Sequence, residues 1–134
     1  MFGKNLIIGH SEGKISDKGR IFLPSFTKPE KDDKILIQKD TYGDEAALKL
    51  IAYSEYLNMI ERYRRLRDTA TSLEEEQKYT KKIEDISLSL THLTKVDAQR
   101  RIQLPKAILE KYNWSPQDTI RYDGLGESLL IRKK

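Results

Sequence analysis

The sequence predicts an α+β fold in which two copies of a strand-rich unit flank a helical hairpin. Three observations support this class: a ten-residue segment recurs later in the chain, each copy is followed by two short apolar runs around a turn, and two amphipathic segments separate the copies. The chain of 134 residues is long enough for one domain. We therefore predict a single pseudo-dimeric domain over 1–134, with repeat one at about 9–53, a helical insertion at about 54–90 and repeat two at about 91–132.

The internal repeat is clearest around two arginines. The segment Ile15–Pro24 aligns with Val96–Pro105 at an offset of 81 residues, and Arg, Ile, Leu and Pro coincide in both copies. Each half is predicted to run as a strand, a turn that carries the arginine, an apolar step into proline, a connector and a β-hairpin.

The predicted hairpins follow the connectors. In repeat one, the apolar runs 34–39 and 48–53 flank turn residues 40–44, and in repeat two the runs 119–122 and 128–132 flank 123–127. Pro105 can begin a helix over 106–112 that ends at Asn113. The connector of repeat one is four residues shorter, so we expect a single helical turn or none there.

The insertion carries two helical patterns. Apolar residues recur at three- and four-residue spacing from Tyr53 to Tyr63, with Ser54 as the expected cap of a helix that ends near Arg67. The second helix begins at the capping box Ser72–Glu75. Its apolar stripe consists of Tyr79, Ile83, Ile86 and Leu90. Packing between the two helices and the sheet is the simplest reason for these apolar residues.

Composition excludes several function classes. The chain has no cysteine and two histidines, His10 and His92, at positions that are not equivalent in the two repeats. We predict no metal, no cofactor, no small-molecule substrate and no enzyme activity, because nucleophile, Gly-rich phosphate loop and dinucleotide signatures are missing. The acidic run Glu74–Glu76 fits the first turn of a helix without any ligand. No apolar run is long enough to cross a membrane, so we expect a cytoplasmic protein.

The basic residues concentrate toward the ends of the chain. The formal net charge is +4, and residues 95–134 carry nine Lys or Arg against five Asp or Glu. Two turns place cations at equivalent points of the repeats: Lys18 and Arg20 in the first, and Gln99, Arg100 and Arg101 in the second. Arginine can bind phosphate or a guanine edge, and glutamine can pair with adenine. If the halves pair about a pseudo-twofold axis, both turns can face one DNA duplex.

This pattern resembles the MraZ family, the two-repeat members of the AbrB/SpoVT superfamily of bacterial transcriptional regulators. The family motif is Asp-x-x-Gly-Arg followed by an apolar-x-apolar-Pro step, and both copies here, Ser16–Pro24 and Asp97–Pro105, follow it in most positions. The resemblance extends over about 9–131. It implies a double-split β-barrel, double-stranded DNA as the partner, homo-oligomeric rings, and control of cell-division and cell-wall genes that often include the protein's own operon. The positions that would contact DNA are Lys18, Arg20, Gln99, Arg100 and Arg101.

Each copy departs from the motif at one position. Ser16 replaces the aspartate in the first copy, and Arg100 replaces the glycine in the second. If that turn requires a positive φ, Arg100 costs about 1 kcal/mol relative to glycine. An alternative function of the same fold is an antitoxin-like protein-interaction module that uses the central helices without specific DNA binding.

Overall fold

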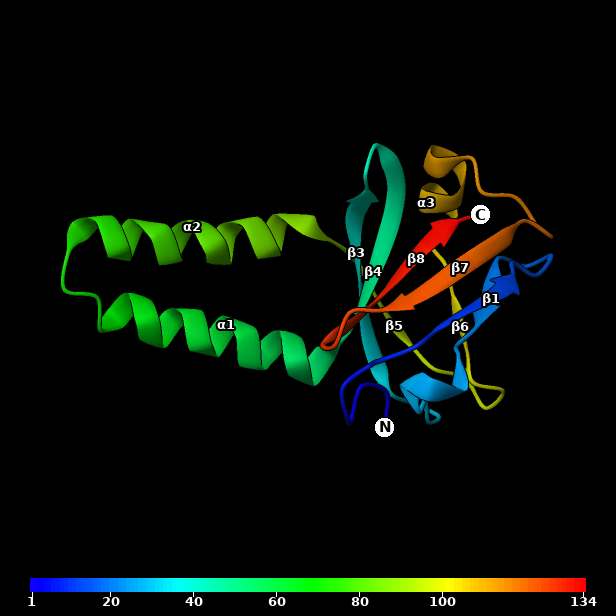
Figure 1. Ribbon diagram of the computed structural model, residues 1–134, viewed down its shortest axis with the longest axis horizontal. Helices are drawn as coiled ribbons and strands as arrows, with labels where there is room; N and C mark the ends of the chain where they lie inside the picture. Colours follow the sequence, from blue (N-terminus) through cyan, green and yellow to red (C-terminus); the bar gives the residue numbers. More distant parts are fainter.

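The structure is a computed structural model that describes the backbone of residues 1–134 and every side chain except that of Thr91 (Figure 1). It is an α+β fold with a mainly antiparallel six-stranded sheet, a two-stranded ribbon and three α-helices. The elements in chain order are β1 (His10–Lys14), β2 (Arg20–Phe22), the 3-10 turn η1 (Ser25–Thr27), β3 (Lys34–Tyr42), β4 (Glu45–Ala52), α1 (Tyr53–Asp68), α2 (Leu73–Ser89), β5 (Leu90–Lys95), β6 (Arg101–Gln103), α3 (Lys106–Tyr112), β7 (Thr119–Gly124) and β8 (Ser128–Lys133).

The two repeats exchange their first strands in the sheet. The strand order is β1-β7-β8-β4-β3-β5, so β1 of the first repeat pairs with β7 of the second, and β5 of the second pairs with β3 of the first. The strands β4 and β8 join the two halves at the centre. The order therefore reads the same from either edge when equivalent strands are exchanged. Because β1 and β5 are the two edges and do not pair with each other, the six-stranded sheet is open, and its pairings alone do not show the double-split β-barrel that the resemblance implies.

Equivalent loops close each exchanged pairing. Ile15, just after β1, bonds through its backbone to Gln117 and Asp118 at 2.8 and 3.1 Å. Val96, just after β5, bonds in the same way to Asp32 and Asp33. Both Asp32 and Gln117 have positive φ, 70° and 71°. The two halves thus repeat not only their strands but also the backbone conformation of these loops.

A second exchange joins the strands that follow the basic turns. In the ribbon of β2 and β6, Ile21 pairs with Ile102, and both side chains are buried in the core. Successive side chains of a strand point to opposite faces, so the residues on either side of each isoleucine lie on the outer face. Arg20 pairs with Gln103 there, and Phe22 pairs with Arg101.

The connectors differ in the two repeats. The connector of repeat two contains α3, which ends at Asn113 with a left-handed φ of 56°, and Trp114 then enters the core. The connector of repeat one contains only η1, in agreement with its shorter length. The N-terminal segment supplies a large apolar side chain there, because Phe2 is buried in the same core and its N–H donates to Asp33 at 2.6 Å.

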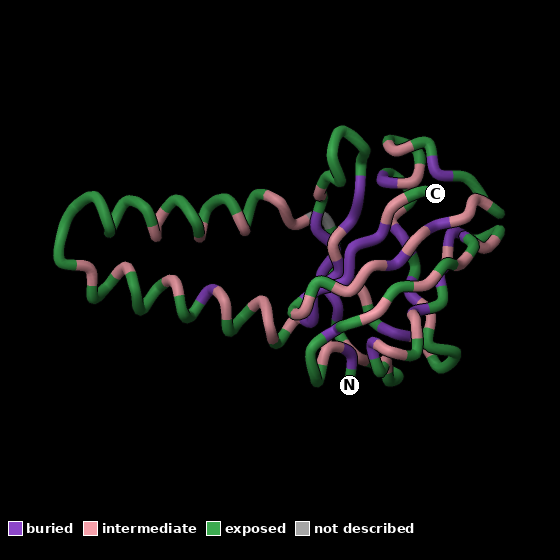
Figure 2. The backbone as a smooth tube through the Cα atoms, viewed as in Figure 1, coloured by how far each residue is buried: buried purple, intermediate pink, exposed green. Residues whose placement is uncertain are grey.

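The helices α1 and α2 form an arm that extends away from the sheet (Figures 1 and 2). In α1 only Ile60 is buried, and in α2 no residue is buried. The predicted cap at Ser72 is confirmed, since Ser72 Oγ accepts the Glu75 N–H at 3.2 Å, but the Glu75 carboxylate accepts the N–H of Thr71 at 3.3 Å in place of that of Ser72. The predicted cap at Ser54 is wrong: the N-cap is Ala52, without a side-chain bond, because the chain passes directly from β4 into the helix. No described helix is both long and apolar enough to cross a membrane.

Candidate nucleic-acid interface

The two basic turns have the same hydrogen-bonding pattern. In turn one, the Ser16 carbonyl accepts the Gly19 N–H at 2.9 Å, and Ser16 Oγ accepts the Arg20 N–H at 3.0 Å. In turn two, the Asp97 carbonyl accepts the Arg100 N–H at 3.1 Å, and Asp97 Oδ1 accepts the Arg101 N–H at 2.9 Å. A serine hydroxyl therefore serves in the first repeat where a carboxylate serves in the second, and the substitution preserves the turn.

Both turns require a left-handed residue before the arginine. Gly19 has φ 77°, and Arg100 has φ 64° at the equivalent position. A Cβ at Gly19 would lie 2.8 Å from Leu109 Cδ1 of α3, so space as well as φ favours glycine there. Arg100 is exposed, and the connector of the other repeat has no full helix at the corresponding place. Turn two therefore has the same shape as turn one, although Arg100 adopts a positive φ that is strained for a non-glycine residue.

The ribbon brings two of the predicted site residues onto one face. Arg20 and Arg101 lie diagonally across β2 and β6, and diagonal neighbours are about 7–8 Å apart in antiparallel strands. Lys18 is exposed at one end of the ribbon, next to Gln103. Gln99 and Arg100 are exposed at the other end, where the Arg100 carbonyl accepts the Leu23 N–H at 3.0 Å. The five predicted residues thus form one central pair and two terminal groups.

Two further residues belong to the same outer face. Phe22 and Gln103 follow their arginines by two positions, so each shares the face of its arginine. The guanidinium carbon of Arg101 lies 5.7 Å from the centroid of the Phe22 ring. Strand alternation in the segments Arg-Ile-Phe and Arg-Ile-Gln was the signal that could have identified both. We define Arg20, Phe22, Arg101 and Gln103 as the ribbon face.

The charges of the two arginines are balanced differently. Arg101 Nε donates to Asp97 Oδ2 at 3.0 Å, while Arg20 has no ion pair or side-chain hydrogen bond with the described residues. Burial of the Asp97 carboxyl raises its pKa, but the N–H groups of Arg101 and Gln99 and the Arg101 guanidinium outweigh burial and hold the pKa below its usual value. Asp97 therefore stays ionised near neutral pH and fixes the orientation of Arg101, whereas Arg20 keeps an uncompensated positive charge.

Other candidate groups do not assemble into a chemical site. His10 lies on β1 and His92 on β5, which are opposite edges of the sheet. Glu74–Glu76 occupy the first turn of α2, as expected for residues that favour a helix N-terminus. Among the side chains that the structure describes, no three His, Cys, Asp or Glu residues gather in a geometry that could hold a metal ion.

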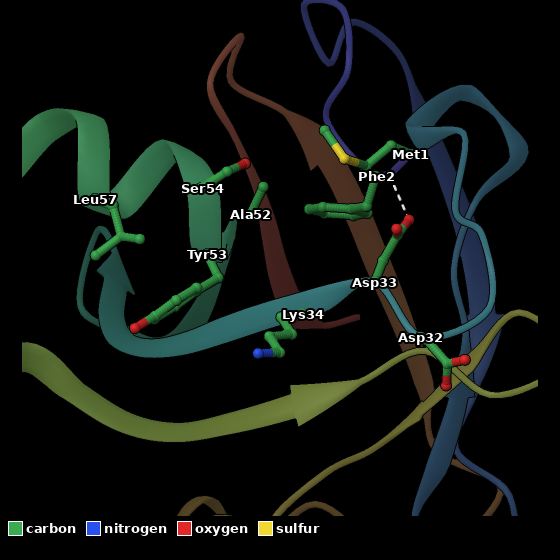
Figure 3. A pocket seen from close by; sticks show the side chains of 9 residues that line it. All are labelled: Met1, Phe2, Asp32, Asp33, Lys34, Ala52, Tyr53, Ser54 and Leu57. Carbon is green, nitrogen blue, oxygen red and sulfur yellow. Dashed lines mark hydrogen bonds between the residues drawn. The ribbon is translucent and has the colours of Figure 1, made fainter.

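A hollow of about 310 Å³ lies at the base of the arm (Figure 3). Its walls include Phe2, Leu57 and Tyr53, with Lys34 Nζ 5.8 Å from the centroid of the Tyr53 ring. The Asp33 carboxylate beside it accepts the N–H groups of Phe2 and Glu30 at 2.6 and 2.9 Å. This carboxylate holds the backbone of the N-terminal segment, so the hollow is a seam between that segment and the arm.

Comparisons with known proteins leave the family open. No protein-family model matches the chain, and no curated protein matches it. Among solved structures, the chain is similar to PHS018 from Pyrococcus horikoshii, described by its solution structure, with a TM-score of 0.41 and 13% sequence identity over 97% of this chain and 91% of that one. A likeness at this level assigns no function.

Proposed function

We propose that this chain is a sequence-specific regulator that binds double-stranded DNA through the ribbon face and the two basic turns. The observation that carries the proposal is the exchanged ribbon, which sets Arg20 and Arg101 on one outer face with further cations at both ends. Phosphate contacts from arginine and lysine position a protein on DNA, and contacts to base edges provide specificity. The protein acts by binding and has no catalytic role.

We also propose the finer assignments that the resemblance implies. These are a double-split barrel of the AbrB type, regulation of cell-division and cell-wall genes including the chain's own operon, and assembly into homo-oligomers. The equivalent hydrogen bonds of the turns at Ser16 and Asp97, and the exchanged pairing of β1 and β5, support a pseudo-dimer built from two interlocked repeats. Sedimentation analysis of the purified chain tests the assembly, because a monomer at all concentrations would refute it.

Fluorescence anisotropy with a duplex from upstream of the chain's own gene tests the function. A scrambled duplex of equal length is the reference, and both are measured over a salt series. We expect the upstream duplex to bind more tightly, and log affinity to fall with log salt by about 0.9 for each phosphate contact. Equal binding to both duplexes contradicts sequence specificity for this element, and no binding at low salt contradicts the proposal.

Arginine variants locate the contact surface. Arg20→Ala should weaken binding and lower the salt slope, and it is the cleaner variant because Arg20 has no partner among the described side chains. Arg101→Ala should also weaken binding, although it leaves Asp97 without its guanidinium. Arg64→Ala is the matched control, since Arg64 is an exposed arginine on the arm. An equal loss in all three variants would show that binding depends only on net charge.

A second candidate is the protein-interaction module. The arm favours it, because α2 buries none of its residues and the exposed apolar residues Leu57, Leu66, Leu73 and Leu88 lie along the two helices or at their ends. A chain that fails to bind either duplex at low salt, while it remains folded, would move the functional surface from the ribbon face to the arm.

A further inference from the structure

The backbones of β2 and β6 occupy equivalent places in the ribbon, but the side chains that they place on the ribbon face differ. At the equivalent positions two residues after each arginine, repeat one has Phe22 and repeat two has Gln103. Gln103 Nε2 donates to the carbonyls of Lys18 and Leu104 at 2.7 and 3.1 Å, so its amide is folded over turn one. Phe22 makes no such inward contact, and its side chain is 59% exposed. One half of the face therefore presents an aromatic ring and the other half presents polar groups.

The aromatic half is tied to the sheet through its backbone. The Phe22 carbonyl accepts the hydroxyl of buried Tyr122 at 2.7 Å, which ties this part of β2 to β7 beneath it. Arg101 lies over the Phe22 ring, and Asp97 holds Arg101 through Nε, so that no hydrogen bond links the two terminal guanidinium nitrogens to any described residue. The aromatic ring and the cation thus lie side by side in the free protein.

We propose that Phe22 is a wedge that contacts an opened base step, so that the chain binds DNA asymmetrically. This inference rests on the proposed DNA-binding function. An exposed apolar side chain among cations can insert between base pairs and kink the duplex, and pyrimidine–purine steps such as TA open most easily. Arg101 contacts the backbone beside the opened step, while Arg20 and the turn of Lys18 contact phosphates of the other half without deforming it. A binding element for this chain therefore needs one deformable step, under the half of the ribbon face that holds Phe22 and Arg101.

The test uses two synthetic duplexes of equal length and composition at low salt. One has a central TA step whose adenine is 2-aminopurine, and the other has the same bases without a pyrimidine–purine step at its centre. The key variant is Phe22→Gln, which copies the residue of repeat two at an exposed position. Circular dichroism confirms that the variant is folded, and Arg20→Ala serves as the charge variant.

We expect wild type to raise 2-aminopurine fluorescence on binding and to prefer the TA duplex. Phe22→Gln should bind the TA duplex about 5- to 150-fold more weakly, the range of a lost base–aromatic stacking contact, with no fluorescence rise and an unchanged salt slope. Arg20→Ala should lower the salt slope and keep the fluorescence rise. Equal affinity and equal fluorescence for wild type and Phe22→Gln would overturn the wedge and leave the proposed function standing. Failure of wild type to bind either duplex would overturn both.

Discussion

Replacing Arg100 by glycine is expected to stabilise the fold and to weaken the proposed DNA binding at the same time. Arg100 has φ 64° at the position where the other repeat has Gly19. A left-handed conformation costs a non-glycine residue about 1–2 kcal/mol. Glycine avoids this cost but destabilises the fold by about 0.5–1 kcal/mol, because it increases the conformational freedom of the unfolded chain. The net gain is about 0.5–1 kcal/mol. Loss of the exposed bond from Arg100 Nη1 to the Ala98 carbonyl, at 3.0 Å, changes this little because both groups can bond to water.

The assay is reversible urea unfolding, followed by the fluorescence of the single tryptophan, Trp114, which is buried in the core. A gain of this size corresponds to a rise in Tm of about 2–5 °C for a domain of this length. Arg100→Ala is the matched control, because it removes the same charge and keeps the left-handed strain. Both variants should lower the salt slope of DNA binding by about 0.9 if Arg100 contacts one phosphate.

The result that refutes this reasoning is specific. If Arg100→Gly and Arg100→Ala change the free energy of unfolding equally, the strain at Arg100 is not what limits stability. If Arg100→Gly is more stable and binds DNA as tightly as wild type, the arginine is not retained in this turn for contact with DNA. The expected combination, more stable and weaker in binding, indicates that a functional residue is held at a structural cost.

Three other changes test the turns and the support beneath the ribbon. Gly19→Ala should destabilise the fold by about 1 kcal/mol, because Gly19 has φ 77° and alanine is strained there, while the end of the Leu109 side chain can move away from the new Cβ; urea unfolding measures this. Asp97→Ser copies the residue of repeat one. The lowered pKa of Asp97 contributes stability that is present above about pH 4 and is lost as the pH falls through the pKa of the folded state. The free energies of unfolding of wild type and variant should therefore converge in acid. Tyr122→Phe should cost about 1 kcal/mol, because it removes the buried bond to the Phe22 carbonyl.

Each of these has an outcome that would contradict it. An alanine at position 19 that leaves stability unchanged would mean that the left-handed φ of this residue does not strain turn one. A constant stability difference between wild type and Asp97→Ser from neutral pH to below pH 4 would exclude the carboxylate as a source of acid sensitivity. A Tyr122→Phe variant with wild-type unfolding would show that water replaces the lost hydroxyl.

The sequence predicts individual helices and strands of this fold, but it does not predict which strands pair with each other. The helix that starts after Ser72 and the helix 106–112 lie where their caps and prolines indicate, because these signals act between residues three or four positions apart. The strands 34–42 and 45–52 extend beyond their apolar runs, because backbone pairing with each other continues into the polar turn. The exchange of β1 and β5 between repeats depends on contacts far apart in the chain, which periodicity does not encode.

The candidate interface was predicted in part for the same reason. The arginines stood out because Arg20 and Arg101 repeat, and the ribbon does bring them to one face. Phe22 and Gln103 were missed because they differ between the copies, and a search for repetition selects what the copies share. The asymmetry of the ribbon face is visible only after the register of β2 and β6 places each residue beside its neighbour from the other repeat.

The exchanged pairing also determines when the protein can fold during its synthesis. His10 pairs with Asp123, so β1 leaves the ribosome long before its neighbour exists. At ordinary elongation rates of about 5–20 residues per second, the wait is about 6–20 s. During that time β1 has no strand partner, and β3 lacks β5 on one side. Neither repeat can complete itself first, and a nascent chain that finds the missing strands on a neighbouring copy would close an intermolecular version of the same fold.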